Sequence, residues 1–203
     1  MIKTIITDLG GVYFSPGTYI AINKINRLLG ISKQKLDEVF ETSQRKEGFL
    51  YRKGKLAKNE FWKRAAKKLK IRKNLVPKLQ KIWHSSYTPT KEMKNLMLKL
   101  RKNHKVIVFS DNVRERFDYL EKKYEIRKDF DELVLSFKAG FNKREPGFYK
   151  VLLKKIGCRP EESILIDNNQ YVLKTAKRFG IKTILFKNPK QLKADLRKFG
   201  VRA

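Results

Sequence analysis

Apolar positions along the chain follow two different periods, and the change between them divides the sequence into segments. Residues 3–8, with Ile5 and Ile6 at their centre, have the character of a strand buried in a parallel sheet. From residue 19 to residue 86 the apolar side chains instead recur every three or four positions, the period of an amphipathic helix. After residue 90 the two patterns alternate. The sequence therefore predicts an α/β core interrupted by a helical insertion.

The inserted segment is expected to hold four helices, each with one apolar face. Those faces are, in chain order, Ile22, Ile25, Leu28 and Leu29; Leu36, Val39 and Phe40; Phe61, Trp62, Ala65, Ala66 and Leu69; and Leu75, Leu79, Ile82 and Trp83. Gly30 is expected to end the first helix, Asn59 to cap the third, and Pro77 to lie in the first turn of the fourth. Because their apolar faces can pack together, residues 17–87 are expected to form a small all-helical domain.

Strands and helices alternate along the remainder of the chain. Further strands are predicted at residues 105–110, 133–135, 163–167 and 182–186, and the helices between them have apolar faces that include Met93 and Leu96, Phe117 and Leu120, Tyr149 and Leu152, and Val172 and Leu173. This alternation favours a Rossmann-like parallel sheet with helices on both faces. The predicted fold class is therefore α/β, with residues 1–16 and 88–203 forming the core domain.

Polar residues stand at several strand ends and in one loop of this predicted core. Asp8 follows the first strand, Ser110 and Asp167 end two others, and Lys143 lies in a loop. Each of them alone could be a loop residue, a helix cap or a surface lysine. Ligands bind at the carboxyl ends of the strands in open parallel sheets, so Asp8, Ser110 and Asp167 are expected at one site. A carboxylate such as Asp8 can be a nucleophile there, a metal ligand or both.

Longer motifs surround these residues. They are Asp8-Leu9-Gly10; Lys143-Arg144-Glu145-Pro146-Gly147-Phe148-Tyr149; Gly54-Lys55-Leu56 with Phe61-Trp62; and Ile166-Asp167-Asn168 with Ala176 and Gly180-Ile181. Together they resemble the haloacid dehalogenase superfamily, in the branch of phosphatases with a helical cap inserted after the first motif. Within that branch the chain is most similar to α-D-glucose-1-phosphate phosphatase-like proteins. The resemblance covers nearly the whole chain and identifies residues 17–87 as the cap.

This resemblance implies phosphoryl transfer through an aspartyl-phosphate. Asp8 and Lys143 would be the catalytic residues, because Asp8 would attack phosphorus while Lys143 neutralises charge on both reacting groups. Ser110, Asp111 and Lys143 would bind the substrate phosphate. A Mg²⁺ ion would be held by Asp8, the main-chain carbonyl of Gly10, Asp167 and Asn168, an oxygen-rich set that suits this hard cation.

The chain departs from the family pattern at three of these positions. Gly10 stands where the family usually has a second Asp, which protonates the leaving group and activates water. General acid–base catalysis is typically worth about 10²–10⁴-fold, so its loss could leave a slow enzyme. Asp111 replaces the usual Asn, and Asn168 replaces a usual Asp. Asp111 could restore part of the acid–base function or rebalance the charge; strand alternation favours rebalancing, since it should turn Asp111 away from Ser110.

The composition shows a strong positive charge and also bears on where in the cell the protein is found. The formal net charge is +29 and the excess is spread over the whole chain, although it is denser in residues 17–88. Such a field attracts phosphorylated substrates and gives weak, non-specific nucleic-acid binding. No apolar run reaches the ~18 residues of a membrane span. The single cysteine, Cys158, cannot form an internal disulfide. We therefore expect a cytoplasmic protein that does not enter a membrane.

Three functions remain open on the sequence. The leading interpretation is a Mg²⁺-dependent phosphatase acting on a small phosphorylated metabolite. The second is a catalytically weak or inactive protein of the same fold that binds nucleic acid or another polyanion, which the charge and Gly10 favour. The third is a 2-haloacid dehalogenase, in which Asp8 would attack carbon without a metal. His84 and His104 are too isolated to indicate a site.

Overall fold

The structure is a computed structural model that describes residues 1–40 and 47–202. Its sheet has five strands, which are β1 (Thr4–Thr7), β2 (Lys105–Ser110), β3 (Glu132–Leu135), β4 (Ser163–Asp167) and β5 (Lys182–Leu185). Their order is β3-β2-β1-β4-β5, and every neighbouring pair is parallel. The predicted α/β fold class is confirmed. β1 lies at the centre of the sheet, so the chain that leaves it enters the middle of the carboxyl-end edge.

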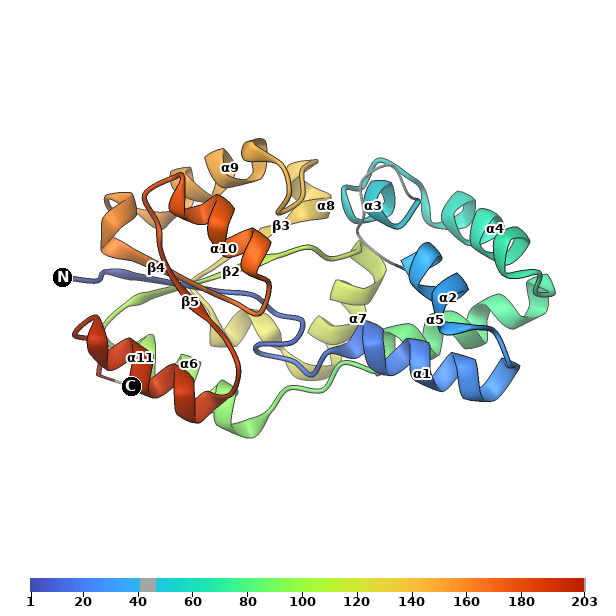
Figure 1. The fold of residues 1–203 in the computed structure, drawn as a ribbon, viewed down its shortest axis with the longest axis horizontal. Helices are drawn as coiled ribbons and strands as arrows, with labels where there is room; N and C mark the ends of the chain where they lie inside the picture. Colours follow the sequence, from blue (N-terminus) through green and yellow to red (C-terminus); the bar gives the residue numbers. More distant parts are fainter. Residues whose placement is uncertain (41–46, 203) are drawn as a thin grey trace.

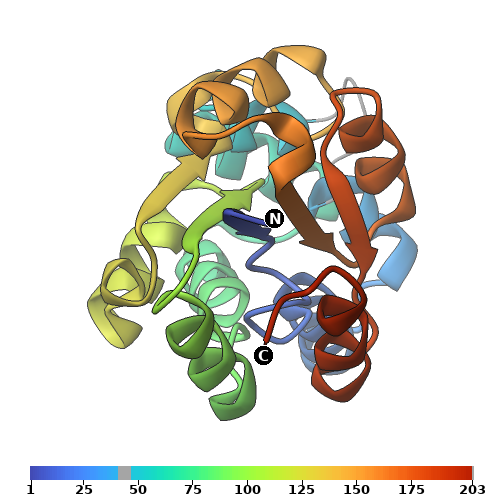
Figure 2. The ribbon, with the colours of Figure 1, turned by 90° about the vertical axis from the view of Figure 1, so that its left-hand side faces the viewer.

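Helices cover both faces of the sheet because the strand side chains alternate between them (Figure 2). Ile5 and Val106 face a core made with α6 (Lys91–Leu100), α7 (Arg114–Tyr124) and α11 (Pro189–Lys198). Ile6 and Ile107 face a second core made with α9 (Pro146–Ile156) and α10 (Gln170–Lys177). A short helix, α8 (Ser136–Ala139), follows β3. Because helices cover both faces of the sheet, a ligand can reach it at the edge formed by the carboxyl ends of the strands.

A helical unit lies beyond that edge (Figure 1). It consists of α1 (Gly17–Leu29), α2 (Lys33–Phe40), α3 (Glu47–Arg52), α4 (Lys58–Leu69) and α5 (Val76–Ser85). A short 3₁₀ helix at Lys73–Leu75 connects α4 to α5, and two more of the described 3₁₀ helices, at Ile126–Asp129 and Pro160–Glu162, lie in the rest of the chain. The unit has its own core, in which the rings of Phe40, Phe61 and Trp62 surround the fully buried Trp83. Among the described residues, no helix combines the length and apolar character needed to cross a bilayer.

Most predicted elements are present, and the differences have local causes. Asn59 is not the cap of its helix, because α4 already begins at Lys58 after Ala57, whose backbone is extended. Leu28 was placed on the buried face of α1 but is 47% exposed. α3, α8 and α11 were not predicted: α3 and α8 have only six and four residues, too few to show a helical period, and α11 is dominated by charged residues.

Candidate active site

The carboxyl ends of three neighbouring strands bring the predicted polar residues together. The last residue of β1, Thr7, pairs with Val108 of β2 and with Ile166 of β4, so the next residue, Asp8, emerges between these two strands. Ser110 and Asp167 are the last residues of β2 and β4 and are almost fully buried. The strand register alone therefore sets a hydroxyl and two carboxylates at one edge.

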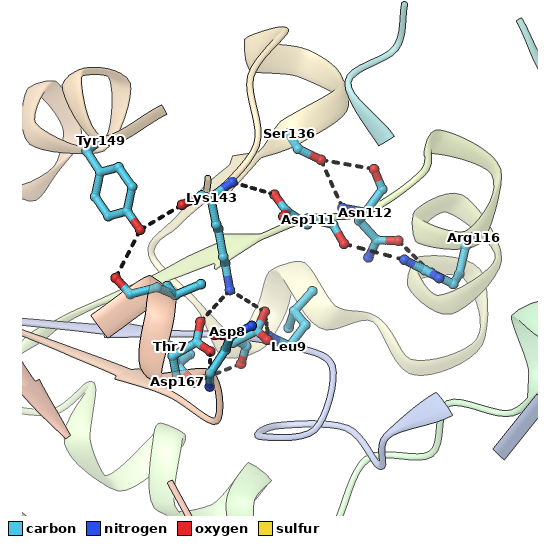
Figure 3. A network of polar contacts seen from close by, with 12 residues as sticks. Thr7, Asp8, Leu9, Asp111, Asn112, Arg116, Ser136, Lys143, Tyr149 and Asp167 are labelled. Carbon is cyan, nitrogen blue, oxygen red and sulfur yellow. Dashed lines mark hydrogen bonds and ion pairs between the residues drawn. The ribbon is translucent and has the colours of Figure 1, made fainter. Parts of the chain in front are cut away.

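Lys143 joins two of these carboxylates (Figure 3). Its Nζ lies 2.8 Å from Asp8 Oδ1 and 2.7 Å from Asp167 Oδ2, and its side chain is only 5% exposed. Asp8 Oδ1 also accepts the N–H of Leu9 at 2.7 Å, and Asp167 Oδ1 accepts the N–H of Asn169 at 2.8 Å. The ammonium is thus held between two carboxylates that are themselves fixed by backbone donors.

The backbone of Lys143 is fixed as firmly as its ammonium. Its N–H donates to Asp111 Oδ1 at 3.0 Å, and its carbonyl accepts the hydroxyl of Tyr149 at 2.9 Å. Asp111 lies just past the end of β2, so strand alternation no longer sets its direction, and its carboxylate is used to hold the Lys143 loop (Figure 3). On the far side of the loop, Glu145 accepts the Asn142 N–H at 2.9 Å and pairs with Lys53, just after α3, at 2.5 Å.

Burial and charge act against each other in this cluster. Burial raises the pKa of Asp8, Lys143 opposes that rise, and the neighbouring Asp167 adds to it. Burial alone would lower the pKa of Lys143, but Asp167, Asp8 and Asp111 raise it well above its usual value. Burial raises the pKa of Asp111 to about 6, against the effect of Lys143. The ammonium stays charged, and it favours the ionised forms of Asp8 and Asp111.

These groups line one pocket of about 250 Å³. All seven predicted site residues contribute to its wall, namely Asp8, Gly10, Ser110, Asp111, Lys143, Asp167 and Asn168. Cys158, His84 and His104 do not; His84 packs against Trp83, and His104 Nδ1 lies 3.1 Å from the carbonyl of Ile2. The topology therefore gathers the residues that the motifs singled out and leaves the isolated ones elsewhere.

Comparison with known proteins identifies the family. Residues 16–186 match the model of the haloacid dehalogenase-like hydrolases. The chain belongs to this family. An uncharacterized protein of Dictyostelium discoideum is 31% identical over 166 residues, which are 79% of this chain and 69% of that protein.

Solved structures of the family share the fold of this hydrolase. A haloacid dehalogenase family enzyme of Bacteroides thetaiotaomicron, solved with magnesium and inorganic phosphate, is 23% identical, with a TM-score of 0.78 over 92% of this chain and 95% of that one. A predicted haloacid dehalogenase-like family hydrolase of Porphyromonas gingivalis is 17% identical, with a TM-score of 0.78 over the whole of both chains. L-2-haloacid dehalogenase of Xanthobacter autotrophicus, with chloropropionic acid covalently bound, is 15% identical, with a TM-score of 0.67 over 100% of this chain and 85% of that one.

The oxygen donors of the hydrolase suit a Mg²⁺ ion that keeps part of its water shell. The described residues contain no group of three or more His, Cys, Asp or Glu side chains placed to hold a metal. Asp8 and Asp167 nevertheless offer two carboxylates, and Mg²⁺ is commonly bound by one or two carboxylates with water and substrate phosphate. Asn168 lies over Gly11: a Cβ at Gly11, which has φ +84°, would lie 2.3 Å from the Asn168 amide nitrogen. The donor set therefore fits Mg²⁺, with Asn168 and the Gly10 carbonyl as neutral additions.

Other pocket residues of the hydrolase were missed by sequence reasoning. Thr18 and Arg52 reach the pocket from the helical unit, Tyr87 from the segment that leaves it, and Arg116 from α7. Arg116 is only 2% exposed, and its Nε donates to Asn112 Oδ1 at 2.7 Å (Figure 3). In a chain with 49 lysines and arginines, no sequence signal separates a buried arginine from the exposed ones.

Proposed function

We propose that this hydrolase is a Mg²⁺-dependent phosphatase that cleaves a small phosphate monoester through an aspartyl-phosphate on Asp8. The observation that carries the proposal is the contact of one buried ammonium, Lys143 Nζ, with both Asp8 and Asp167 in the wall of the pocket. An anionic nucleophile and an anionic substrate repel each other, and a fixed cation between them lowers that repulsion. The magnesium and phosphate bound to the Bacteroides enzyme of the same fold support this chemistry.

Each residue of the cluster has a role in this reaction. Asp8 Oδ1 already accepts the Leu9 N–H and the Lys143 ammonium, so we assign the attack on phosphorus to its other oxygen, Oδ2. Lys143 keeps the Asp8 carboxylate ionised and offsets charge on the transferred group. The Ser110 hydroxyl, at the end of β2, donates to a phosphoryl oxygen. Asp111 positions Lys143 through the loop N–H and faces the same phosphate site.

A Mg²⁺ ion at this site would be held by Asp8, Asp167, the Gly10 carbonyl and Asn168, and it would stabilise negative charge on the phosphoryl oxygens. Asp167 would then contact both the metal ion and the Lys143 ammonium. One of its oxygens contacts Lys143 and the other accepts the Asn169 N–H, so its carboxylate is already oriented. The chain contributes the orientation of these donors before any ligand arrives.

The helical unit acts in this proposal as a cap that selects the substrate. Thr18 of α1 and Arg52 of α3 lie in the wall of the same pocket as Asp8. A volume of about 250 Å³ suits a metabolite-sized phosphate ester rather than a polymer. The resemblance to the α-D-glucose-1-phosphate phosphatase-like branch also favours a small phosphate monoester. The core would then be residues 1–16 and 88–203, and the cap residues 17–87.

The positive charge has a smaller role in the proposal. A net charge of +29 attracts a phosphate ester from solution and also any nucleic acid present. We expect short nucleic acids to bind weakly, without sequence preference and with a steep salt dependence. Nanomolar, sequence-selective binding near physiological salt would instead favour a polyanion-binding protein.

Turnover of para-nitrophenyl phosphate with and without Mg²⁺ tests the proposal. We expect Mg²⁺-dependent release of phosphate and a loss of more than about 1000-fold in Asp8→Asn, which keeps the shape of the side chain but not its nucleophilicity. The matched control is Asp118→Asn, an exposed residue of α7, which should keep full turnover. Full activity of Asp8→Asn would end the mechanism. Release of chloride from 2-chloropropionate without Mg²⁺, and no release of phosphate, would make the protein a dehalogenase.

A further inference from the structure

The side chain of Tyr87 lies beside Gly10, the position at which the family usually has an acidic residue. A Cβ added at Gly10 would find Tyr87 Cε1 as its nearest neighbour, at 3.4 Å. A Cβ added at Gly17 would lie 2.3 Å from Tyr87 Cδ2 and Cγ, so only glycine at position 17 leaves room for the ring. Tyr87 is 6% exposed and lines the same pocket as Asp8. Gly10 and Gly17 therefore leave room for the Tyr87 ring next to the position where the family's carboxylate is missing.

The Tyr87 hydroxyl belongs to a short chain of hydrogen bonds. Its oxygen accepts from Arg116 Nη1 at 2.9 Å and lies 2.5 Å from the Thr18 hydroxyl. Thr18 Oγ1 already accepts the indole N–H of Trp83 at 3.1 Å, so Thr18 can give its own hydrogen to Tyr87. When Thr18 donates, the phenol oxygen accepts two hydrogen bonds, and its own hydrogen is left for a group in the pocket.

Arg116 supplies a positive charge to this oxygen. The guanidinium lies 4.9 Å from the ring centre of Trp83 and 4.6 Å from that of Tyr87. Its polar partners, Asn112 Oδ1, the Tyr87 hydroxyl and the Asp111 carbonyl, are all neutral, and no carboxylate within the described ranges forms an ion pair with it. A buried cation with neutral partners favours an anion nearby. A phenolate at Tyr87 would meet that need.

We propose that Tyr87 is the acid–base residue of this enzyme, in place of an Asp at position 10. The inference rests on the proposed phosphatase function. As Asp8 forms its bond to phosphorus, the bond from phosphorus to the leaving oxygen breaks, and the Tyr87 O–H proton passes to that oxygen. Arg116 and Thr18 stabilise the phenolate that remains. When water attacks the aspartyl-phosphate, the phenolate takes a proton from it, which releases phosphate and restores both Asp8 and Tyr87.

The test compares a poor leaving group with a good one in Tyr87→Phe, which keeps the ring and removes only the hydroxyl. An alkyl phosphate such as glycerol phosphate needs a proton in the transition state, whereas para-nitrophenolate leaves without one. We expect turnover of the alkyl ester to fall about 100-fold and turnover of the aryl ester to fall only a few-fold. Tyr124→Phe is the matched control, because Tyr124 also packs on Phe14 but lies outside the pocket, and it should leave both rates unchanged.

A second variant separates catalysis from structure. Adding Gly10→Asp to Tyr87→Phe returns an acid to the adjacent position and should restore most of the alkyl-phosphate turnover. Equal losses with both esters, no loss with either, or a selective loss in Asp111→Asn instead would overturn the proposal. The phosphatase function is judged separately by the wild type and Asp8→Asn on the aryl ester. A wild type that hydrolyses neither ester contradicts both proposals.

Discussion

The two sides of the pocket are built on different principles. On the side of β1 and β4, charges contact charges: Lys143 lies within 2.8 Å of both Asp8 and Asp167. On the side of the helical unit, a buried cation contacts neutral oxygens, as Arg116 donates to Asn112 and Tyr87. The first side is complete before a substrate binds. The second holds a charge, on Arg116, with no counter-charge among the residues that the structure describes, which suits a side where negative charge develops on a leaving group.

The comparison teaches that a departure at a motif must be examined in its surroundings. Taken alone, Gly10 suggests an active site that has lost its acid–base residue and with it part of its activity. In the fold, the space beside it is occupied by a tyrosine whose hydroxyl accepts a hydrogen bond from an arginine. The chemistry that one position loses can be supplied by another that is 77 positions away along the chain but adjacent in space.

Lys143→Met should have the largest effect, because it removes the charged centre of the first side. Asp8 and Asp167 would then face each other without a cation, so we expect turnover to fall more than about 1000-fold. Breaking such a buried pair costs about 3–5 kcal/mol, which urea unfolding without metal should detect. The exposed Lys150→Met serves as control. Unchanged stability and turnover would show that the ammonium is not needed there.

Glu145→Gln should have a smaller effect on both stability and turnover, because Glu145 connects the two sides of the pocket. Glu145 accepts the Asn142 N–H and pairs with the buried Lys53, so it connects the Lys143 loop to the segment that follows α3. Loss of this charge should lower the free energy of unfolding by about 1–3 kcal/mol. Turnover should fall several-fold, because the loop that carries Lys143 loosens. Glu132→Gln, which loses a more exposed pair with Lys155, should change neither quantity measurably.

Gly10→Asp in the otherwise unchanged chain tests whether proton donation on the Tyr87 and Arg116 side of the pocket limits turnover. The 3.4 Å approach of Tyr87 Cε1 leaves room for a Cβ at position 10. Because Tyr87 already supplies a proton in our proposal, the added carboxyl group should raise turnover of alkyl phosphates less than about tenfold and change aryl esters least. An equal rise with both esters would mean that proton donation is not what limits this enzyme.

His84→Phe should change the response to acid without a large effect on activity. The ordinary imidazole pKa of 6.5 is lowered to about 3 in the fold, chiefly by burial and then by Arg116. Between these values the unfolded chain binds more protons than the folded one, so stability falls as the pH is lowered through this window. The loss is about 1.4 kcal/mol per pH unit and should be absent in His84→Phe, as measured by urea unfolding at pH 7, 5.5 and 4. An identical pH dependence in both proteins would contradict this.

The sequence predicted those parts of the fold and site that depend on local pattern. The apolar runs ending at Asp8, Ser110 and Asp167 were sufficient to predict a parallel sheet with these residues at one edge, and all three line the pocket. The side of the pocket formed by Tyr87 and Arg116 could not be predicted. Each stands in a segment with no motif, and their contact is a product of how the helical unit packs on α7. Whether a guanidinium is buried depends on tertiary packing, which no local sequence pattern shows.

Chemical trapping of the enzyme during turnover tests the central claim most directly, namely that Asp8 carries the phosphoryl group. The protein is mixed with para-nitrophenyl phosphate and Mg²⁺, quenched with acid within the first turnover, digested and examined by mass spectrometry. The account predicts one added phosphoryl group on the peptide that contains Asp8, and none in Asp8→Asn. Hydrolysis by the wild type without this adduct, or with an adduct on another residue, would contradict it.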